Sequence, residues 1–334
     1  MSAVLLDLRN EVRRRGLLDL SPRWYTLNLM FHVALVGVSV ALLVITRSLW
    51  VAPLMAFAYY QVGLLYHDFG HYQAYPERAL NDAMGMVAGF VIGGSLARWR
   101  LDHDAHHGHT NLIASDPDLE GPVAHTAAMA RERKGLGRVL ARTQHLWLLP
   151  LSCLVLMPII RTKDLVHVFT RRYPRRGLEL TLLLCHYALY LGLVFGLLPP
   201  ARAVAFIALH QTLFGASFAM SFLINHTGMP ARTERPADWI AAQIQSTRNV
   251  RHSAFFDYLF GPLAPHIEHH AFPGMPRPNL REVSALLREY AQATSVEFRE
   301  LPSWQVHADL VRSLHEVGAH ARGAPTTVSS PEVK

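Results

Sequence analysis

Residues 51–71 read VAPLMAFAYYQVGLLYHDFGH, an apolar run that leads directly into two histidines. A helix of about 20 apolar residues is long enough to cross a bilayer. Pro53 suits the first turn of such a helix, because its missing N–H costs no hydrogen bond there. His67 and His71 are one helical turn apart, so both imidazoles project from one face. The stretch therefore predicts a membrane-crossing helix, 51–70, that ends on candidate metal ligands.

Three other apolar runs have nearly the same length, and they cover residues 27–45, 178–199 and 202–225. The turn-forming stretch 46–50 makes 27–45 and 51–70 a predicted helical hairpin. Two shorter runs, 83–97 and 146–160, are expected to be interfacial or re-entrant. The predicted fold class is therefore an all-α integral membrane protein with four transmembrane helices.

The basic residues predict how these spans are oriented. They are concentrated before the first span and in the polar stretches 98–142 and 161–176, whereas the turns at 46–50 and 199–202 carry one arginine each. By the positive-inside rule, both termini and the middle region are cytoplasmic. They would form a helical cap on the cytoplasmic side. The net charge of +7 fits membrane lipids with anionic headgroups as partners, with docking of an acidic protein as a second use. We expect no nucleic-acid partner.

The same patterns suggest domain boundaries. We expect a cytoplasmic N-terminal segment over 1–26, a membrane domain over 27–285, a C-terminal helical segment over 286–320 and a disordered tail over 321–334. The first apolar run is too long and begins too late for a signal peptide, which makes it a retained anchor. The two cysteines, Cys153 and Cys185, lie inside apolar runs and are expected to pack there.

Two further histidine clusters also have helical spacing. Residues 103–107 read HDAHH and residues 266–270 read HIEHH, and positions i, i+3 and i+4 share one face of a helix. His226 directly follows the fourth predicted span, which would bring it to the same side of the membrane. Nine imidazoles exceed the four to six ligands of one ion. The sequence therefore predicts a di-metal site in the cytoplasmic cap. Its predicted ligands are His67, His71, His103, His106, His107, His226, His266, His269 and His270.

The acids within the clusters are expected to hold the outer ring nitrogens of the ligands, as carboxylates commonly do at metal sites. These acids are Asp68, Asp102, Asp104 and Glu268. Ordinary solvated charges are the alternative for Asp68 and Asp102. His186 and His210 lie inside the third and fourth apolar runs, where neutral, hydrogen-bonded structural histidines are the expectation and a functional role is the alternative.

Together these motifs resemble the membrane fatty acid desaturase family. The resemblance lies in HDFGH at 67–71, HDAHHGHTN at 103–111, HIEHHAFPGMPRPNL at 266–280 and the pair Asn225-His226. It covers about residues 25–285 and is strongest to the acyl-lipid branch. The third box begins with His266, whereas the front-end desaturases that share its following residues usually have glutamine there.

The resemblance implies a chemistry for the nine histidines. They would be the ligands of two non-haem iron ions, with His109, Asn111 and Asn225 as supporting or water-holding groups. Dioxygen would be the co-substrate, and a fatty acyl chain on a phospholipid, coenzyme A or acyl carrier protein would gain a double bond. Front-end desaturases often carry a fused cytochrome b5 domain, which this sequence does not show. The expected electron donor is therefore a separate ferredoxin, or cytochrome b5 with its reductase.

Two alternatives stay open from the residues alone. A hydroxylase, ketolase or acetylenase on the same scaffold would begin with the same C–H abstraction. A membrane metal transporter would also need histidines, but it would place them near the bilayer centre. In this sequence the clustered histidines follow the spans, which favours the oxidative enzyme.

Overall fold

The computed structural model describes residues 3–321, which form two compact units. The expected disordered tail lies outside the described residues, except for Ala321. Among the described residues, unit 1 comprises 3–19, 102–150 and 220–321, and unit 2 comprises 20–101 and 151–219. Helices α5 (Leu96–His109), α7 (Gly135–Thr170) and α9 (Pro200–His226) each contribute residues to both units.

Unit 2 holds most of the apolar helices. Its remaining elements are α2 (Pro22–Thr46), η1 (Leu49–Val51), α3 (Ala52–Gly70), α4 (Arg78–Ile92) and α8 (Arg176–Leu197). Helix α3 packs against both α2 and α4, which makes α3 the most enclosed helix of the unit. On α2 and α8, large apolar side chains such as Met30 and Leu189 are each 63% exposed. Apolar surface of this extent is typical of a helix that faces lipid.

The predicted helical hairpin is present in unit 2. Helix α2 ends where Arg47 adopts a left-handed conformation, with φ of 49°. The hydroxyl of Ser48 accepts a hydrogen bond from the backbone N–H of Trp50 at 3.2 Å and starts the next helical segment. Pro53 lies in the first turn of α3, where a proline is tolerated. A polar contact also joins the break between α4 and α5 to α8, since the Ser95 hydroxyl donates to the Glu179 carboxylate at 2.6 Å.

Five helices within 3–321 are long and apolar enough to cross a membrane, where four were predicted. They are α2, η1 with α3, α7, α8 and α9. The additional one is α7, because the run 146–160 lies inside a helix of 36 residues. The run appears short in the sequence because charged residues flank it, but those residues continue the helix. Helices α4 and α5 form a further candidate, bent by 106° at Gly93 to Ser95, which makes it a broken span or a re-entrant loop, whereas the run 83–97 was expected to be interfacial or re-entrant. These helices are compatible with a multi-pass membrane protein.

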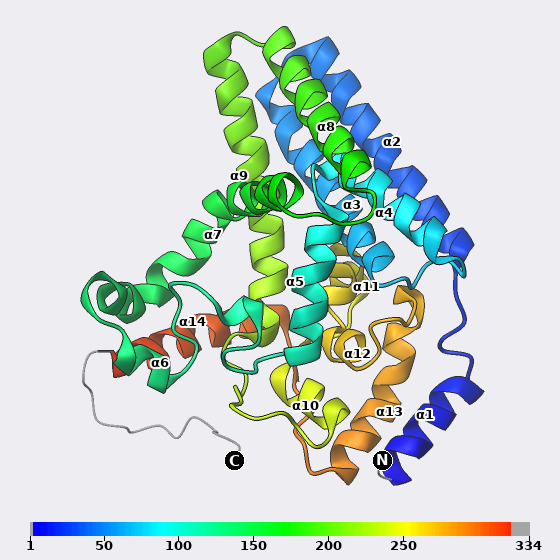
Figure 1. Ribbon diagram of the computed structural model, residues 1–334, viewed down its shortest axis with the longest axis vertical. Helices are drawn as coiled ribbons and strands as arrows, with labels where there is room; N and C mark the ends of the chain where they lie inside the picture. Colours follow the sequence, from blue (N-terminus) through cyan, green and yellow to red (C-terminus); the bar gives the residue numbers. More distant parts are fainter. Residues whose placement is uncertain (1–2, 322–334) are drawn as a thin grey trace. The chain divides into compact units, whose positions relative to one another are not determined.

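Unit 1 contains shorter helices around its own apolar core. Its elements are α1 (Ala3–Arg14), η2 (Pro117–Leu119), α6 (Ala127–Glu132), α10 (Trp239–Ser246), α11 (Ala254–Phe260), η3 (Gly261–Leu263), α12 (His266–Ala271), η4 (Arg277–Asn279), α13 (Leu280–Ala293) and α14 (Ser303–His320). The core joins α1, α10, α12 and α13 through residues such as Leu8, Ile244, Ile267 and Leu287. Figure 1 shows α1 alongside α13.

Two short strands are a small departure from the predicted all-helical class. Strands β1 (Asn249–Val250) and β2 (Glu300–Leu301) pair in parallel, with Asn249 opposite Glu300. The backbone N–H of Arg251 extends the pairing by donating to the carbonyl of Leu301 at 2.7 Å. The pairing ties the chain just after α10 to the start of α14, and so it fixes the segment that leads into α12.

Candidate metal centre

Four histidines of unit 1 turn their Nε2 atoms toward one another, and we name them the His106 cluster: His106, His226, His266 and His270. The Nε2 atom of His226 lies 3.3 Å from that of His106 and 3.0 Å from that of His266. The rings of His226 and His270 have centroids 4.6 Å apart. All but His226 are almost fully buried. The cluster draws on the ends of α5 and α9 and on α12.

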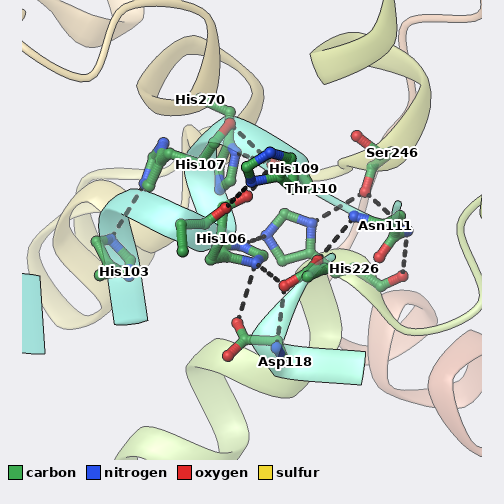
Figure 2. Close-up of polar contacts among 12 residues, drawn as sticks. His103, His106, His107, His109, Thr110, Asn111, Asp118, His226, Ser246 and His270 are labelled. Atoms are coloured by element: carbon green, nitrogen blue, oxygen red, sulfur yellow. Dashed lines mark hydrogen bonds and ion pairs between the residues drawn. The ribbon is translucent and has the colours of Figure 1, made fainter. Parts of the chain in front are cut away.

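The opposite ring nitrogen of each member faces a hydrogen-bond acceptor. Nδ1 of His106 lies 2.9 Å from an Asp116 oxygen and 3.1 Å from an Asp118 oxygen. Nδ1 of His226 lies 2.9 Å from the Ser246 carbonyl, a contact visible in Figure 2. A carbonyl or carboxylate only accepts, so these Nδ1 atoms carry the proton and the Nε2 atoms keep a lone pair.

The same rule applies to the remaining two members. His266 donates through Nδ1 to the Pro262 carbonyl at 3.3 Å. His270 has two neighbours at Nδ1, the Gln243 side-chain oxygen at 3.0 Å and the Thr110 hydroxyl at 3.3 Å. Its Nε2 atom is buried and has no hydrogen-bond partner. His106, His226 and His270 are therefore arranged to offer lone pairs to a shared point, and His266 faces His226 beside them.

This arrangement fits a metal ion. Two neutral imidazoles whose bare Nε2 atoms face each other at 3.0 Å repel, unless a cation lies between them. Ligand nitrogens bound at about 2.1 Å from one ion lie roughly 2.9–3.4 Å apart in octahedral or tetrahedral geometry. The nitrogens of His106, His226 and His270 all lie within 4.8 Å of one another. The donor set suits zinc, iron, copper or nickel, because imidazole binds all four.

A second group in unit 1 has the same character, and we name it the His107 cluster: His103, His107 and His269. The Nε2 atom of His107 lies 3.1 Å from that of His103 and 3.2 Å from that of His269. The His107 ring also stacks on His270, with centroids 4.1 Å apart, so the two clusters adjoin. Seven of the nine predicted ligands therefore come together within unit 1, in two groups, as expected for two ions.

The other two predicted ligands lie in unit 2. The rings of His67 and His71 have centroids 4.8 Å apart at the end of α3. Both contact Trp99, at 5.4 Å and 5.6 Å between centroids. The Nδ1 atom of His67 lies 3.1 Å from an Asp68 oxygen, the kind of contact expected for Asp68. A side chain at Gly70 would collide with the Trp99 ring, with an added Cβ 2.0 Å from it. The absence of a side chain there lets the indole lie beside the histidine pair.

The supporting residues expected from the sequence have mixed positions. Asn111 donates through Nδ2 to the carbonyls of His226 and Ser246, at 3.3 and 3.4 Å. His109 bonds through Nδ1 with the carbonyl of Ala105 at 3.0 Å. Asn225 donates to the Ser221 carbonyl at 3.0 Å, and its own side-chain oxygen is buried without a hydrogen-bond partner.

Among the other acids expected beside the ligands, Glu268 has partners that differ from the expectation. Asp104 is exposed on α5. Glu268 is buried, but its oxygens accept from Asn249 at 2.7 Å and from the Ser284 hydroxyl rather than from a histidine ring. Burial raises the pKa of Glu268, although these two hydrogen bonds act in the opposite direction. Glu268 therefore fixes α12 to its neighbours in unit 1. The ligand rings are held by other groups.

Sequence reasoning missed the groups that hold the rings. Asp116 accepts from the backbone N–H of Asn111 at 2.8 Å as well as contacting His106. Gln243 donates through Nε2 to the His107 carbonyl at 3.0 Å, which turns its oxygen toward His270. No spacing pattern marks either residue. The Asp116-Pro-Asp118 stretch so soon after the second box was the one available signal.

A buried arginine supports His226 from behind. Arg248 is fully buried, and it donates from Nε to the Ile224 carbonyl at 2.5 Å and from Nη2 to the Thr227 carbonyl. These carbonyls lie on either side of His226. Burial lowers the pKa of Arg248 to about 10, so the guanidinium remains charged at neutral pH. Asp309 lies 3.9 Å away and partly balances that charge.

The electrostatics differ within the cluster, because at His106 the effect of burial is outweighed by the carboxylates of Asp118 and Asp116, which raise its pKa, whereas His270 is held neutral. Burial holds the pKa of His270 well below its usual value, and the neighbouring rings of His107 and His266 act in the same direction. At neutral pH the ring is therefore uncharged, as a metal ligand must be.

Comparison with known proteins agrees with the motifs. Residues 46–302 match the family model described as Fatty acid desaturase. The chain is 31% identical to Delta(5) fatty acid desaturase fat-4 of Caenorhabditis elegans, over 87% of this chain and 68% of that protein. It is 27% identical to Acyl-lipid (9-3)-desaturase of Physcomitrium patens, over 97% of this chain and 64% of that protein. It is also 28% identical to a Delta(8)-fatty-acid desaturase of Euglena gracilis, over 95% of this chain and 78% of that protein.

Proposed function

The chain belongs to the fatty acid desaturase family, and from this membership we propose that it inserts a carbon–carbon double bond into a fatty acyl chain. The reaction would convert a –CH2–CH2– unit, dioxygen, two electrons and two protons into –CH=CH– and two waters. The observation that carries the proposal is the convergence of Nε2 atoms in the His106 and His107 clusters.

We propose that the two clusters hold iron, one ion each. Two bound iron ions would supply the activation of dioxygen and the removal of hydrogen from the acyl chain. From the family pattern, and not from any distance, we propose His67 and His71 as further iron ligands.

The protein itself fixes the orientation of the ligand rings and keeps solvent away from them. Asp116, Ser246 and Gln243 hold Nδ1 protons, which fixes the tautomer and rotation of His106, His226 and His270. Burial of the cluster keeps solvent from the reacting site. These residues would therefore set metal affinity without contacting the acyl chain.

We propose that the protein is a multi-pass membrane protein with its metal site and both termini on the cytoplasmic side, which requires that an even number of the candidate helices cross the membrane. The support is the distribution of arginine and lysine around the apolar helices. Its electrons would come from a ferredoxin or from cytochrome b5 with its reductase. Labelling of single cysteines placed in the turns at 46–50 and 199–202 would test the sidedness. Labelling of either turn from the cytoplasm would contradict it.

The activity is tested by lipid profiling of a desaturase-deficient host that expresses the chain. A fatty acid two mass units lighter than its precursor is the expected product, and iron should exceed zinc in the purified protein. A product that has gained oxygen would indicate a hydroxylase or ketolase, and a triple bond would indicate an acetylenase. About one zinc and no iron per chain would contradict the proposal altogether.

A further inference from the structure

A small basic pocket in unit 1 lies beside the His106 cluster and is not used by the proposed chemistry. It has a volume of about 220 Å³, and its lining includes His109, Thr110, Arg232, Arg235 and Gln243. The lining comes from the end of α5, from the segment between α9 and α10, and from α10 itself. A water occupies about 30 Å³ in the liquid, so the pocket has room for a phosphate group with a few waters.

The charge of the lining selects an anion. Two guanidinium groups and one imidazole face this space, and the described lining residues include no carboxylate. Asp238 directly precedes α10 and already has hydrogen-bond partners. It accepts from the Ala241 N–H and from the Tyr290 hydroxyl. Glu234 is exposed next to Arg235. The pocket therefore keeps a net positive charge.

Arg232 is held in place but not satisfied. Its backbone pairs with the chain after the second histidine box, through Arg232 N–H to the Asn111 carbonyl at 2.9 Å and Ile113 N–H to the Arg232 carbonyl at 2.7 Å. Its Nη2 donates to the Thr110 carbonyl at 2.9 Å, whereas its Nε is buried without a hydrogen-bond partner. A buried donor without an acceptor is costly, and a bound anion would remove that cost. Burial also lowers the pKa of Arg232, an effect that an anion would reverse.

Arg235 supplies a second, accessible guanidinium. It is exposed, and among residues 3–321 the structure gives it no ion pair. Guanidinium groups recognise phosphate well, because several of its oxygens can each accept from a fork of N–H donors.

The floor of the pocket connects it to the metal ligands. Thr110 and Gln243 line the pocket and also contact Nδ1 of His270, at 3.3 and 3.0 Å. Only one layer of side chains therefore separates a group in the pocket from the His106 cluster.

We propose that this pocket binds the phosphate of the head group that carries the fatty acyl substrate. The inference rests on the proposed function only in naming what the phosphate is attached to. Two sources share this chemistry, the phosphodiester of a phospholipid and the pyrophosphate of coenzyme A. Either would anchor the polar end of the substrate beside the ligand histidines.

Binding is tested on the metal-loaded, detergent-purified full chain by isothermal titration calorimetry with inorganic pyrophosphate. We expect saturable binding that weakens about tenfold in Arg235→Gln and is lost in Arg232→Gln/Arg235→Gln. Arg251→Gln is the matched control, because Arg251 is an exposed arginine of unit 1 outside the pocket. It should bind as the wild type does. No binding by the wild type, or equal binding by the double variant, would overturn the proposal.

Competition identifies the source of the phosphate. Displacement of pyrophosphate by coenzyme A would indicate a thioester carrier, and displacement by glycerol 3-phosphate would indicate a phospholipid. Displacement by neither would contradict a head-group site.

Two further measurements distinguish misfolding of the arginine variants, and failure of the proposed function, from failure of the pocket proposal. Arg235→Lys keeps the charge, so it should bind pyrophosphate better than Arg235→Gln while both retain wild-type metal content. If the enzyme is active, Arg235→Gln should raise KM severalfold with little change in kcat. If the wild type makes no unsaturated product but binds pyrophosphate through these arginines, the proposed function fails and the pocket stands.

Discussion

His210 in unit 2 and His270 in unit 1 are both fully buried, and a glutamine contacts Nδ1 of each, yet the two glutamines present opposite ends. Arg161 donates to the Gln211 oxygen at 3.1 Å, which turns the Gln211 amide nitrogen toward His210 at 3.0 Å. Nδ1 of His210 must then accept, and the proton lies on Nε2. Gln243, turned by the His107 carbonyl, presents its oxygen to His270 instead. The group that bonds the far end of each glutamine amide, Arg161 or the His107 carbonyl, thus decides whether the buried histidine can offer Nε2 to a metal.

The largest effect should come from removing the two histidines themselves. We expect His270→Leu to lose metal and to abolish desaturation, because it deletes one of four facing nitrogens. The loss should exceed the roughly 10–100-fold that removal of an outer partner costs. His210→Leu should keep wild-type metal content, although its melting temperature can fall. Elemental analysis of both purified variants checks this, and wild-type metal content in His270→Leu would refute the assignment.

The contrast also shows what the sequence could predict. The spacing of the boxes marked His103, His106 and His107 because helical geometry alone brings i, i+3 and i+4 together. Apolar runs likewise predicted the helices α2, α3, α8 and α9, since length and hydropathy are local properties. Nothing local separates Gln211 from Gln243, because the orientation of each amide depends on a group far along the chain.

The additional candidate span has a related cause. The run 146–160 is short because arginines flank it, but a helix does not end where its apolar residues end. Helix α7 continues through them to Gly135 and Thr170. Asp116, like Gln243, could not be predicted from local sequence. The chain must turn back after α5 before the Asp116 carboxylate reaches His106.

A smaller effect is expected at Asp116, whose carboxylate accepts from Nδ1 of His106 as the Gln243 oxygen accepts from Nδ1 of His270. Asp116 is fully buried and contacts His106 at 2.9 Å, whereas the Asp118 side chain is 37% exposed and contacts the same nitrogen at 3.1 Å. Asp116→Asn places an amide N–H against existing donors, and we expect a loss of about 10–100-fold in metal affinity. Asp118→Asn should lose less, because water can replace an exposed oxygen. Chelator titration followed by metal analysis measures both, and a larger loss in Asp118→Asn would contradict this ranking.

The glutamines themselves give the closest matched pair. Gln243→Leu removes the acceptor of His270 and frees that ring to rotate, so we expect about a tenfold loss of metal affinity, near the lower end for such partners. Gln211→Leu removes an amide that only fixes a non-ligand tautomer, and it should leave metal affinity unchanged. The same chelator titration applies. Equal losses in the two variants would mean that amide orientation does not distinguish the two regions.

The smallest effect is expected from Thr110→Val, which tests the second acceptor on His270. The one proton on Nδ1 is shared between the Gln243 oxygen at 3.0 Å and the Thr110 hydroxyl at 3.3 Å, and the shorter contact should dominate. The hydroxyl also donates to the His106 carbonyl at 2.9 Å, a bond that the helix backbone does not need. We therefore expect metal affinity to fall by no more than about threefold. Because valine has nearly the shape of threonine, packing is kept, and a loss as large as that in Gln243→Leu would show that the hydroxyl, not the amide, sets the tautomer of His270.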